Sequence, residues 1–158
     1  MIRASLVVIF AMACGAGAKG GPSMNNKIGG AEVVKPVSPV VSADILARDP
    51  VANKAEVKHI LISWKDIGKD KRALARTKAD AEAEVKAILE QLKAGTDFDS
   101  LMKEHSEDPG SASSARMNSV ATDSQLVIEF RQLALRLNVD EVGVCESDFG
   151  FHIIRRYQ

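Results

Sequence analysis

The stretch Ser147-Asp148-Phe149-Gly150-Phe151-His152-Ile153-Ile154-Arg155-Arg156 closes the chain and decides its fold. The Ser-Asp pair and Gly150 indicate a turn, and the residues after it alternate with a period of two. This period predicts a strand over 150–156, and apolar residues on both of its faces favour a central place in a sheet. His152 lies in the middle of this strand, where a buried imidazole needs a hydrogen-bond partner.

A second segment has the same design. Val57-Lys58-His59-Ile60-Leu61-Ile62 is rich in strand-forming residues and also contains a single histidine. We expect the two strands to lie side by side, with His59 close to His152. If the two rings share a hydrogen bond, at least one of them must be neutral, because two adjacent imidazolium ions would repel each other.

The residues between these strands carry helix signals. Thr77 and Asp80 form a capping pattern, an apolar stripe follows, and Gly95 is a typical C-terminal stop. With weaker strands around 116–120 and 142–146, the order is β-α-α-β-α-β-β. This order predicts an α+β fold, in which helices cover a mainly antiparallel sheet of four strands. The predicted helices run from Thr77 to Gly95, from about Thr96 to a turn at 106–110, and over about 124–137.

Length and charge limit the possible classes of protein. The chain has 158 residues and a formal net charge of +0, which provides no electrostatic footprint for nucleic acid. Helix and strand patterns begin only around Ala55. The sequence therefore predicts one domain over 55–158, which is small but large enough to bury a core.

The amino end is typical of a targeting segment. Residues 1–14 combine a basic start with a short apolar run ending in Ala11-Met12-Ala13-Cys14, which suits a signal peptide. Small residues before a cysteine resemble the bacterial lipobox, in which Cys14 would carry the lipid anchor. An ordinary signal peptide is the alternative. Gly15, rather than Asp, follows Cys14, which favours anchoring in the outer membrane and a domain that faces the periplasm.

Residues 15–54 have the glycines and prolines of a flexible linker, with room for one helical turn over 42–48. Such a linker would hold the domain away from a membrane surface. Once Cys14 is lipidated, Cys145 has no partner for a disulfide. Its place in an apolar strand predicts a buried structural thiol.

Five segments follow one another in a recognisable order: His59-Ile60-Leu61-Ile62, Gly95-Thr96-Asp97-Phe98-Asp99-Ser100-Leu101, Ser106-Glu107-Asp108-Pro109, Gln125-Leu126-Val127-Ile128-Glu129-Phe130 and Phe149-Gly150-Phe151-His152-Ile153-Ile154. Together they resemble the parvulin-type peptidyl-prolyl isomerases across residues 55–158. The resemblance implies a parvulin/FKBP-like fold and isomerisation of X-Pro bonds, without a metal or cofactor.

The same resemblance implies roles for individual residues. His59 and His152 match the paired histidines at the floor of the family's site, and Asp108 matches its Cys or Asp. These three would form the catalytic group. The proline pocket and its rim would bind the substrate through Leu126, Phe130, Gln125 and Phe149.

Two departures from the family pattern bear on activity. The family's glycine-rich segment is replaced by 111–118, where Ser and Ala resist backbone conformations that glycine allows. Ile128 and Glu129 stand where the family has a proline before the pocket Phe. Two functions therefore stay open. One is an exported isomerase that acts on proline-containing unfolded or extended polypeptides, and the other is an inactive parvulin-like chaperone or assembly module tethered to the cell envelope.

Several of these motifs also have a structural interpretation. A histidine inside a strand is usually a core residue, and Leu126 and Phe130, four apart on a helix, are more often core than pocket. Four basic residues lie where some relatives hold a phosphate-binding loop, but two aspartates interrupt them, which favours a solvated loop. The basic residues are Lys69, Lys71, Arg72 and Arg76.

We predict that Cys14→Ser leaves an unprocessed or soluble protein, because acyl chains at this residue would be the membrane anchor. Fractionation of cells that express the wild type or the variant measures this directly. Membrane association that survives the substitution unchanged would rule out the lipid anchor.

Overall fold

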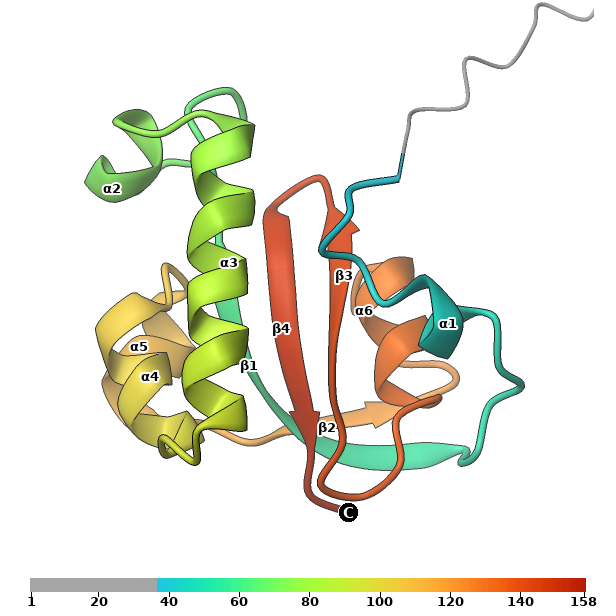
Figure 1. The fold of residues 1–158 in the computed structure, drawn as a ribbon. Coiled ribbons are helices and arrows are strands. Elements are labelled where there is room, and N and C mark those ends of the chain that lie inside the picture. Colours follow the sequence, from blue (N-terminus) through green and yellow to red (C-terminus); the bar gives the residue numbers. More distant parts are fainter. Residues whose placement is uncertain (1–36) are drawn as a thin grey trace, which may run out of the picture. The chain divides into compact units, whose positions relative to one another are not determined.

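The computed structural model describes residues 37–158, which form one four-stranded sheet with helices on both faces (Figure 1). Neighbouring strands are antiparallel throughout, in the order β2-β1-β4-β3. The predicted α+β fold is therefore confirmed. The strands are β1 (Lys54–Ile62), β2 (Asn118–Ala121), β3 (Val142–Ser147) and β4 (Gly150–Arg156).

The predicted strand at the end of the chain is β4, and it lies between β1 and β3 as its two apolar faces require. In the β1–β4 register, His59 is opposite Ile154 and Leu61 is opposite His152. Residues directly opposite each other, and residues two apart along a strand, share one face of a sheet. The two histidines are therefore diagonal neighbours on one face, which confirms that their strands lie side by side.

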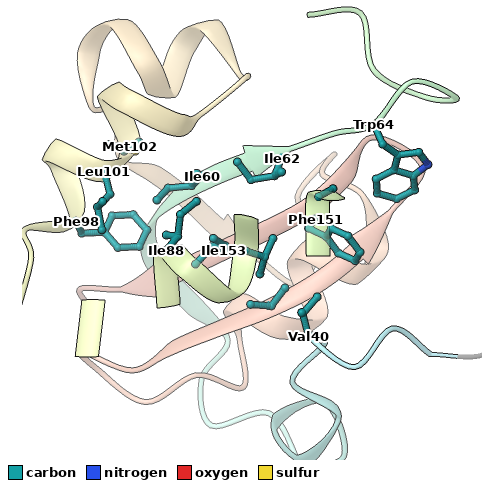
Figure 2. Packing of buried hydrophobic residues seen from close by; sticks show 13 residues of the cluster. Val40, Ile60, Ile62, Trp64, Ile88, Phe98, Leu101, Met102, Phe151 and Ile153 are labelled. Carbon is teal, nitrogen blue, oxygen red and sulfur yellow. The ribbon is translucent and has the colours of Figure 1, made fainter. Parts of the chain in front are cut away.

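The alternation along β1 and β4 divides the core into two hydrophobic clusters. On one face, Ile60 and Ile153 pack beneath α3 (Lys78–Lys93) and α4 (Phe98–His105), as Figure 2 shows. On the other face, which carries the two histidines, α6 (Ile128–Ala134) provides the cover. The members of this second cluster include Val57, Val120, Phe130, Leu133, Leu137, Cys145 and Ile154.

The helix signals around α3 are confirmed. The Thr77 hydroxyl accepts a hydrogen bond from the backbone N–H of Asp80, and the Asp80 carboxylate accepts one from the N–H of Thr77. This reciprocal pair is the expected capping box. Gly95 follows the helix at φ +93°, a left-handed conformation that glycine adopts without steric cost.

The third predicted helix is shorter than expected. The pattern predicted about 124–137, whereas α6 begins only at Ile128. The Ser124 hydroxyl accepts a hydrogen bond from the N–H of Ala121 at 2.7 Å and holds the preceding residues in a turn. Such local side-chain bonds compete with helical ones.

Two short helices, α2 (Lys71–Leu74) and α5 (Pro109–Ser114), were not expected. The described part of the chain contains no helix that is both long and apolar enough to cross a membrane.

The segment before β1 belongs to the folded domain. Val40 is buried in the cluster beneath α3, and Ile45 is buried in the cluster beneath α6, so the segment crosses the β3 edge of the sheet. At that edge the Ser42 N–H donates to the Val144 carbonyl at 2.9 Å, and the Ser42 hydroxyl accepts from the Val144 N–H at 3.0 Å. The short helix α1 (Ala43–Leu46) confirms the helical turn expected here.

The expectation of a flexible linker over 15–54 is therefore wrong for residues 37–54. Val40 and Ile45 are buried on opposite faces of the sheet, so neither a helical nor a strand period connects them and the pattern gave no signal. The predicted signal peptide at 1–14, with Cys14, and the linker residues 15–36 lie outside the described residues.

We predict that Ile45→Ala destabilises the domain by about 2–5 kcal/mol, the usual cost of truncating a buried Ile. Urea unfolding followed by circular dichroism measures the change. The matched control is Val37→Ala in the same segment, whose side chain is 67% exposed and contributes little. Equal stabilities of the two variants would mean that the segment does not pack against the sheet.

Candidate active site

Two histidine rings and one phenylalanine ring form the centre of the site. His59 on β1 and His152 on β4 are 8% and 6% exposed, and their ring centroids are 5.6 Å apart. Phe130 on α6 stands edge-on to both rings, at 5.1 Å from His59 and 5.4 Å from His152. Edge-to-face contacts of this kind add about 0.5–1.5 kcal/mol to the burial of the rings.

The polar partners of His59 come from α5 and from the first residue of β2. The amide nitrogen of Asn118 lies 3.3 Å from Nδ1, and the Ser111 hydroxyl lies 3.4 Å from the same atom. Because an amide N–H₂ can only donate, Nδ1 accepts from Asn118 and the ring proton is on Nε2, 3.9 Å from Oδ2 of Asp108. The Ser111 hydroxyl donates its own proton to Asp108, so toward His59 it acts as an acceptor for the Nε2–H, at 3.5 Å. Burial lowers the pKa of His59, although Asp108 opposes this effect. The ring is neutral at pH 7.

His152 has different partners. Its Nε2 lies 2.8 Å from the Ser147 hydroxyl, and its buried Nδ1 has no hydrogen-bond partner within 37–158. Burial, followed by the proximity of His59, lowers the pKa of His152 to about 3. The expected hydrogen bond between the two histidines is not formed, because each ring directs a nitrogen to another residue. Ser147 was missed in the sequence, where it stood only as a turn residue.

Asp108 is the N-cap of α5. Its Oδ2 accepts hydrogen bonds from the backbone N–H and the hydroxyl of Ser111, at 2.8 and 2.7 Å. Burial acts to raise the pKa of this carboxyl, but the two bonds from Ser111 and the charges of His59 and Arg116 outweigh it and lower the pKa. Asp108 is therefore an anion at neutral pH, beside a neutral imidazole.

One pocket of about 370 Å³ is lined by all the site residues that the family resemblance implied: His59, Asp108, Gln125, Leu126, Phe130, Phe149 and His152. They come from β1, the start of α5, α6 and the residues before it, the β3–β4 turn and β4. The sequence did not single out four further lining residues. These are Leu61, Arg116, Asn118 and Val127.

The segment that replaces the family's glycines keeps an unusual backbone. Ala115, at the C-terminal end of α5, has φ +50° and ψ +38°, the left-handed conformation. For a residue with a Cβ this conformation costs about 1–2 kcal/mol. The turn at Ala115 nevertheless brings Arg116 and Asn118 to the pocket wall, so the loop is built without glycine at a local energetic cost.

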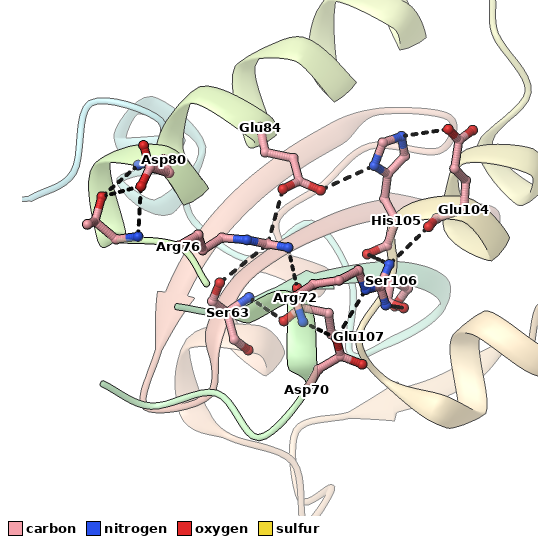
Figure 3. A network of polar contacts seen from close by, with 11 residues as sticks. Ser63, Asp70, Arg72, Arg76, Asp80, Glu84, Glu104, His105, Ser106 and Glu107 are labelled. Carbon is pink, nitrogen blue, oxygen red and sulfur yellow. Dashed lines mark hydrogen bonds and ion pairs between the residues drawn. The ribbon is translucent and has the colours of Figure 1, made fainter. Parts of the chain in front are cut away.

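Two of the four basic residues near the first helix have structural contacts (Figure 3). Arg72 donates to the backbone carbonyls of Glu104, His105 and Ser106 at 3.0, 3.3 and 2.9 Å. The Arg76 side chain is only 11% exposed, and its guanidinium lies 2.7 Å from Glu107 and 3.1 Å from Glu84. The solvated-loop interpretation is wrong for Arg76, whose side chain is buried, whereas Arg72 is exposed to solvent on α2. Neither guanidinium is free to bind an anion.

Glu107 attaches the residues before Asp108 to β1. Its N–H donates to the Leu61 carbonyl at 2.9 Å, and its Oε2 accepts from the N–H of Ser63 at 3.0 Å. Burial raises the pKa of Glu107. Its Oε1 accepts no hydrogen bond but lies 2.7 Å from the Arg76 guanidinium, and this contact is an ion pair. A buried charge is tolerated only when it is paired. The Arg76–Glu107 pair thus supports the position of Asp108.

Cys145 lies on β3 in the cluster beneath α6. Burial, together with the charge of Glu129, raises the pKa of its thiol well above the ordinary value. A protonated, buried thiol is unreactive, which confirms the prediction of a structural cysteine.

Within residues 37–158, no group of three or more His, Cys, Asp or Glu side chains is arranged to hold a metal ion.

We predict that the fold loses stability as the pH falls below about 6.5. The pKa of His152 is about 3 in the folded chain and has its ordinary value of 6.5 in the unfolded chain. Between these values only the unfolded chain takes up the proton, so folding becomes less favourable. The loss is on the order of 3 kcal/mol between pH 7 and pH 4.

Urea unfolding at several pH values measures this loss, and His152→Gln is the comparison because it keeps a polar side chain that does not titrate. The variant should lose much less stability than the wild type over the same range. Asp108, whose pKa is lowered, adds its own loss only below its unfolded pKa of 3.8. The same pH dependence in both proteins would contradict the burial of a neutral His152.

The chain is similar in sequence and fold to known proteins. The model of the PPIC-type PPIase domain matches residues 44–157. Foldase protein PrsA of Geobacillus kaustophilus is 31% identical over 122 residues, which is 73% of this chain and 43% of that protein. Chaperone SurA of Saccharophagus degradans is 30% identical over 142 residues, 85% of this chain and 30% of that protein. The crystal structure of PrsA from Bacillus cereus matches with a TM-score of 0.51 at 30% identity, over 75% of this chain and 39% of that one.

The chain spans less than half the length of these relatives. The match to the family model nevertheless covers most of the chain and includes every residue that lines the pocket. It also includes both central strands and all the helices from α2 to α6. The chain therefore belongs to the family of PPIC-type, or parvulin-type, peptidyl-prolyl isomerase domains.

Proposed function

We propose that this chain is a peptidyl-prolyl cis/trans isomerase for X-Pro bonds in unfolded or extended polypeptides. The observation that carries the proposal is the pocket, which combines the apolar side chains of Leu126 and Phe130 with the polar groups of Asp108 and His59. Membership of the family and the relatives named foldase and chaperone support the same activity.

The reaction requires no bond to break. Rotation about a peptide bond crosses a barrier of about 18–20 kcal/mol, and uncatalysed X-Pro isomerisation takes tens of seconds or more. The barrier reflects the amide resonance that is lost when the bond twists. A catalyst must therefore bind the twisted amide more tightly than either planar isomer.

Each part of the pocket has a role in this proposal. Leu126 and Phe130 hold the prolyl ring and exclude water, which leaves the amide in a less polar environment. Asp108 and the Nε2–H of His59 present fixed polar groups to the amide as its charge distribution changes. They are held in place by Ser111 and by the attachment of Glu107 to β1, so little reorganisation is needed during the reaction.

Proton transfer by the histidines is not part of the proposal. His152 has a pKa of about 3, and burial also lowers the pKa of His59, so neither ring is an imidazolium that could act as a general acid at neutral pH. The rings instead form a rigid floor against which Phe130 packs. Their neutrality keeps charge away from the apolar side of the pocket.

We further propose that the chain is exported and assists the folding of exported proteins in the bacterial cell envelope. The relatives named PrsA and SurA and the targeting pattern of residues 1–14 support this location. A lipid at Cys14 and an outer-membrane attachment remain proposals from the sequence. The domain would then face the periplasm and meet its clients before they fold.

A chaperone or assembly module without catalytic activity is the second candidate. The observation that favours it is Ala115, which occupies a left-handed conformation where the family uses a glycine-rich segment. The loop nevertheless forms, and Asp108 and Asn118 reach His59. For this reason we place the isomerase first.

The deciding experiment is exchange NMR spectroscopy of short Xaa-Pro peptides with the purified protein. An isomerase accelerates cis/trans exchange in proportion to its concentration, whereas an inactive module binds the peptides and leaves the exchange rate at its spontaneous value. The second result would reject the proposed enzyme.

We predict that Phe130→Leu lowers kcat/KM by about tenfold or more, because the pocket loses the ring that packs against both histidines. The matched control is Phe98→Leu, a fully buried Phe in the cluster on the opposite face of the sheet. Both variants should lose roughly 1 kcal/mol of stability. Equal activity of the two folded variants would show that Phe130 is only a core residue.

A further inference from the structure

Two charged side chains line the pocket, Asp108 and Arg116. The Asp108 carboxylate already accepts two hydrogen bonds from Ser111. The two histidine rings are neutral at pH 7, as shown above. Arg116 therefore carries the positive charge of this pocket.

Arg116 differs from the other arginines in the described part of the chain. It is exposed and forms neither a hydrogen bond nor an ion pair with any residue in 37–158. Seven other arginines in this range each donate at least one hydrogen bond to a carboxylate or a carbonyl. They are Arg48, Arg72, Arg76, Arg131, Arg136, Arg155 and Arg156.

The backbone holds Arg116 close to Asp108. The left-handed turn at Ala115 ends α5 and directs the next residue back over the first turn of that helix. A Cβ placed on Gly110 would lie 3.4 Å from Nη2 of Arg116 and 3.4 Å from Oδ2 of Asp108. The two charged groups thus lie within about 7 Å of each other, but farther apart than an ion pair, with Gly110 leaving the space between them open.

A neighbouring hollow carries charged side chains of its own. This hollow, of about 500 Å³, shares the lining residues Leu61 and Phe149 with the pocket. Its lining contains one lysine and three carboxylates: Lys69, Asp70, Glu107 and Asp148. Asp70 and Glu107 are paired with Arg72 and Arg76, so the charge of the hollow stays close to balanced. The cation that lines the pocket itself is Arg116.

We propose that Arg116 is a specificity-determining residue that binds the carboxylate of an acidic side chain next to the client's proline. The inference rests on the proposed isomerase function and adds a class of preferred client to it. A guanidinium presents two parallel N–H donors that match a carboxylate, and it stays charged at any physiological pH. Because the site is exposed, the preference is modest and sensitive to salt.

The experiment compares Glu-Pro, Pro-Glu and the corresponding Gln peptides, with kcat/KM from exchange NMR and Kd from peptide titration. We expect the wild type to favour Glu over Gln by about three- to fivefold on at least one side of the proline. Arg116→Gln brings this ratio close to one, Arg116→Lys retains part of it, and Arg116→Glu inverts it. High salt lowers the ratio in the wild type alone.

The matched control is Lys103→Gln, which removes one positive charge from an exposed position on α4 that lines neither the pocket nor the hollow. It should keep the wild-type ratio.

An identical Glu/Gln ratio in the wild type and in Arg116→Gln overturns the inference. If no peptide is isomerised but the Kd ratio still depends on Arg116, the isomerase proposal fails and the binding site stands. Absence of discrimination in both measurements overturns the site as well.

Discussion

The antiparallel pairing of β1 with β4 is the constraint on which the rest of the structure depends. It joins the first and last strands of the sheet and sets His59 and His152 diagonally on one face. A register shift of one residue would move every side chain of a strand to the opposite face. The histidines would then enter the core beneath α3, where no Phe130 and no loop from α5 could meet them. The site exists because this register is fixed by apolar residues on both faces.

Two neutral imidazoles on a buried face are costly, and the structure reduces this cost with partners from separate elements. Ser147 serves His152, while Ser111 and Asn118 serve His59. The partners of His59 lie on a loop that is itself tied to β1 through Glu107 and the buried charge of Arg76. The polar side of the pocket is therefore supported by an ion pair outside it.

The loop between α5 and β2 shows how a site tolerates an unfavourable local sequence. Ala115 adopts a conformation that glycine would adopt freely, and hydrogen bonds of Asp108 and Asn118 hold the chain on either side of it. The same turn exposes Arg116 at the pocket wall. A departure from the family pattern that first suggested lost activity is thus also the feature that gives this pocket its own charge.

The sequence by itself determined the elements whose signals are local: the capping box at Thr77, the stop at Gly95 and the central strand around His152. The order and spacing of five segments also identified seven of the residues that line the pocket, through the resemblance to the family. Only the tertiary structure decided the burial of the segment before β1, the partners of each imidazole, and the contrast between paired and free arginines. These features depend on contacts between residues far apart in the chain, and such contacts leave no period, cap or turn signal in the sequence.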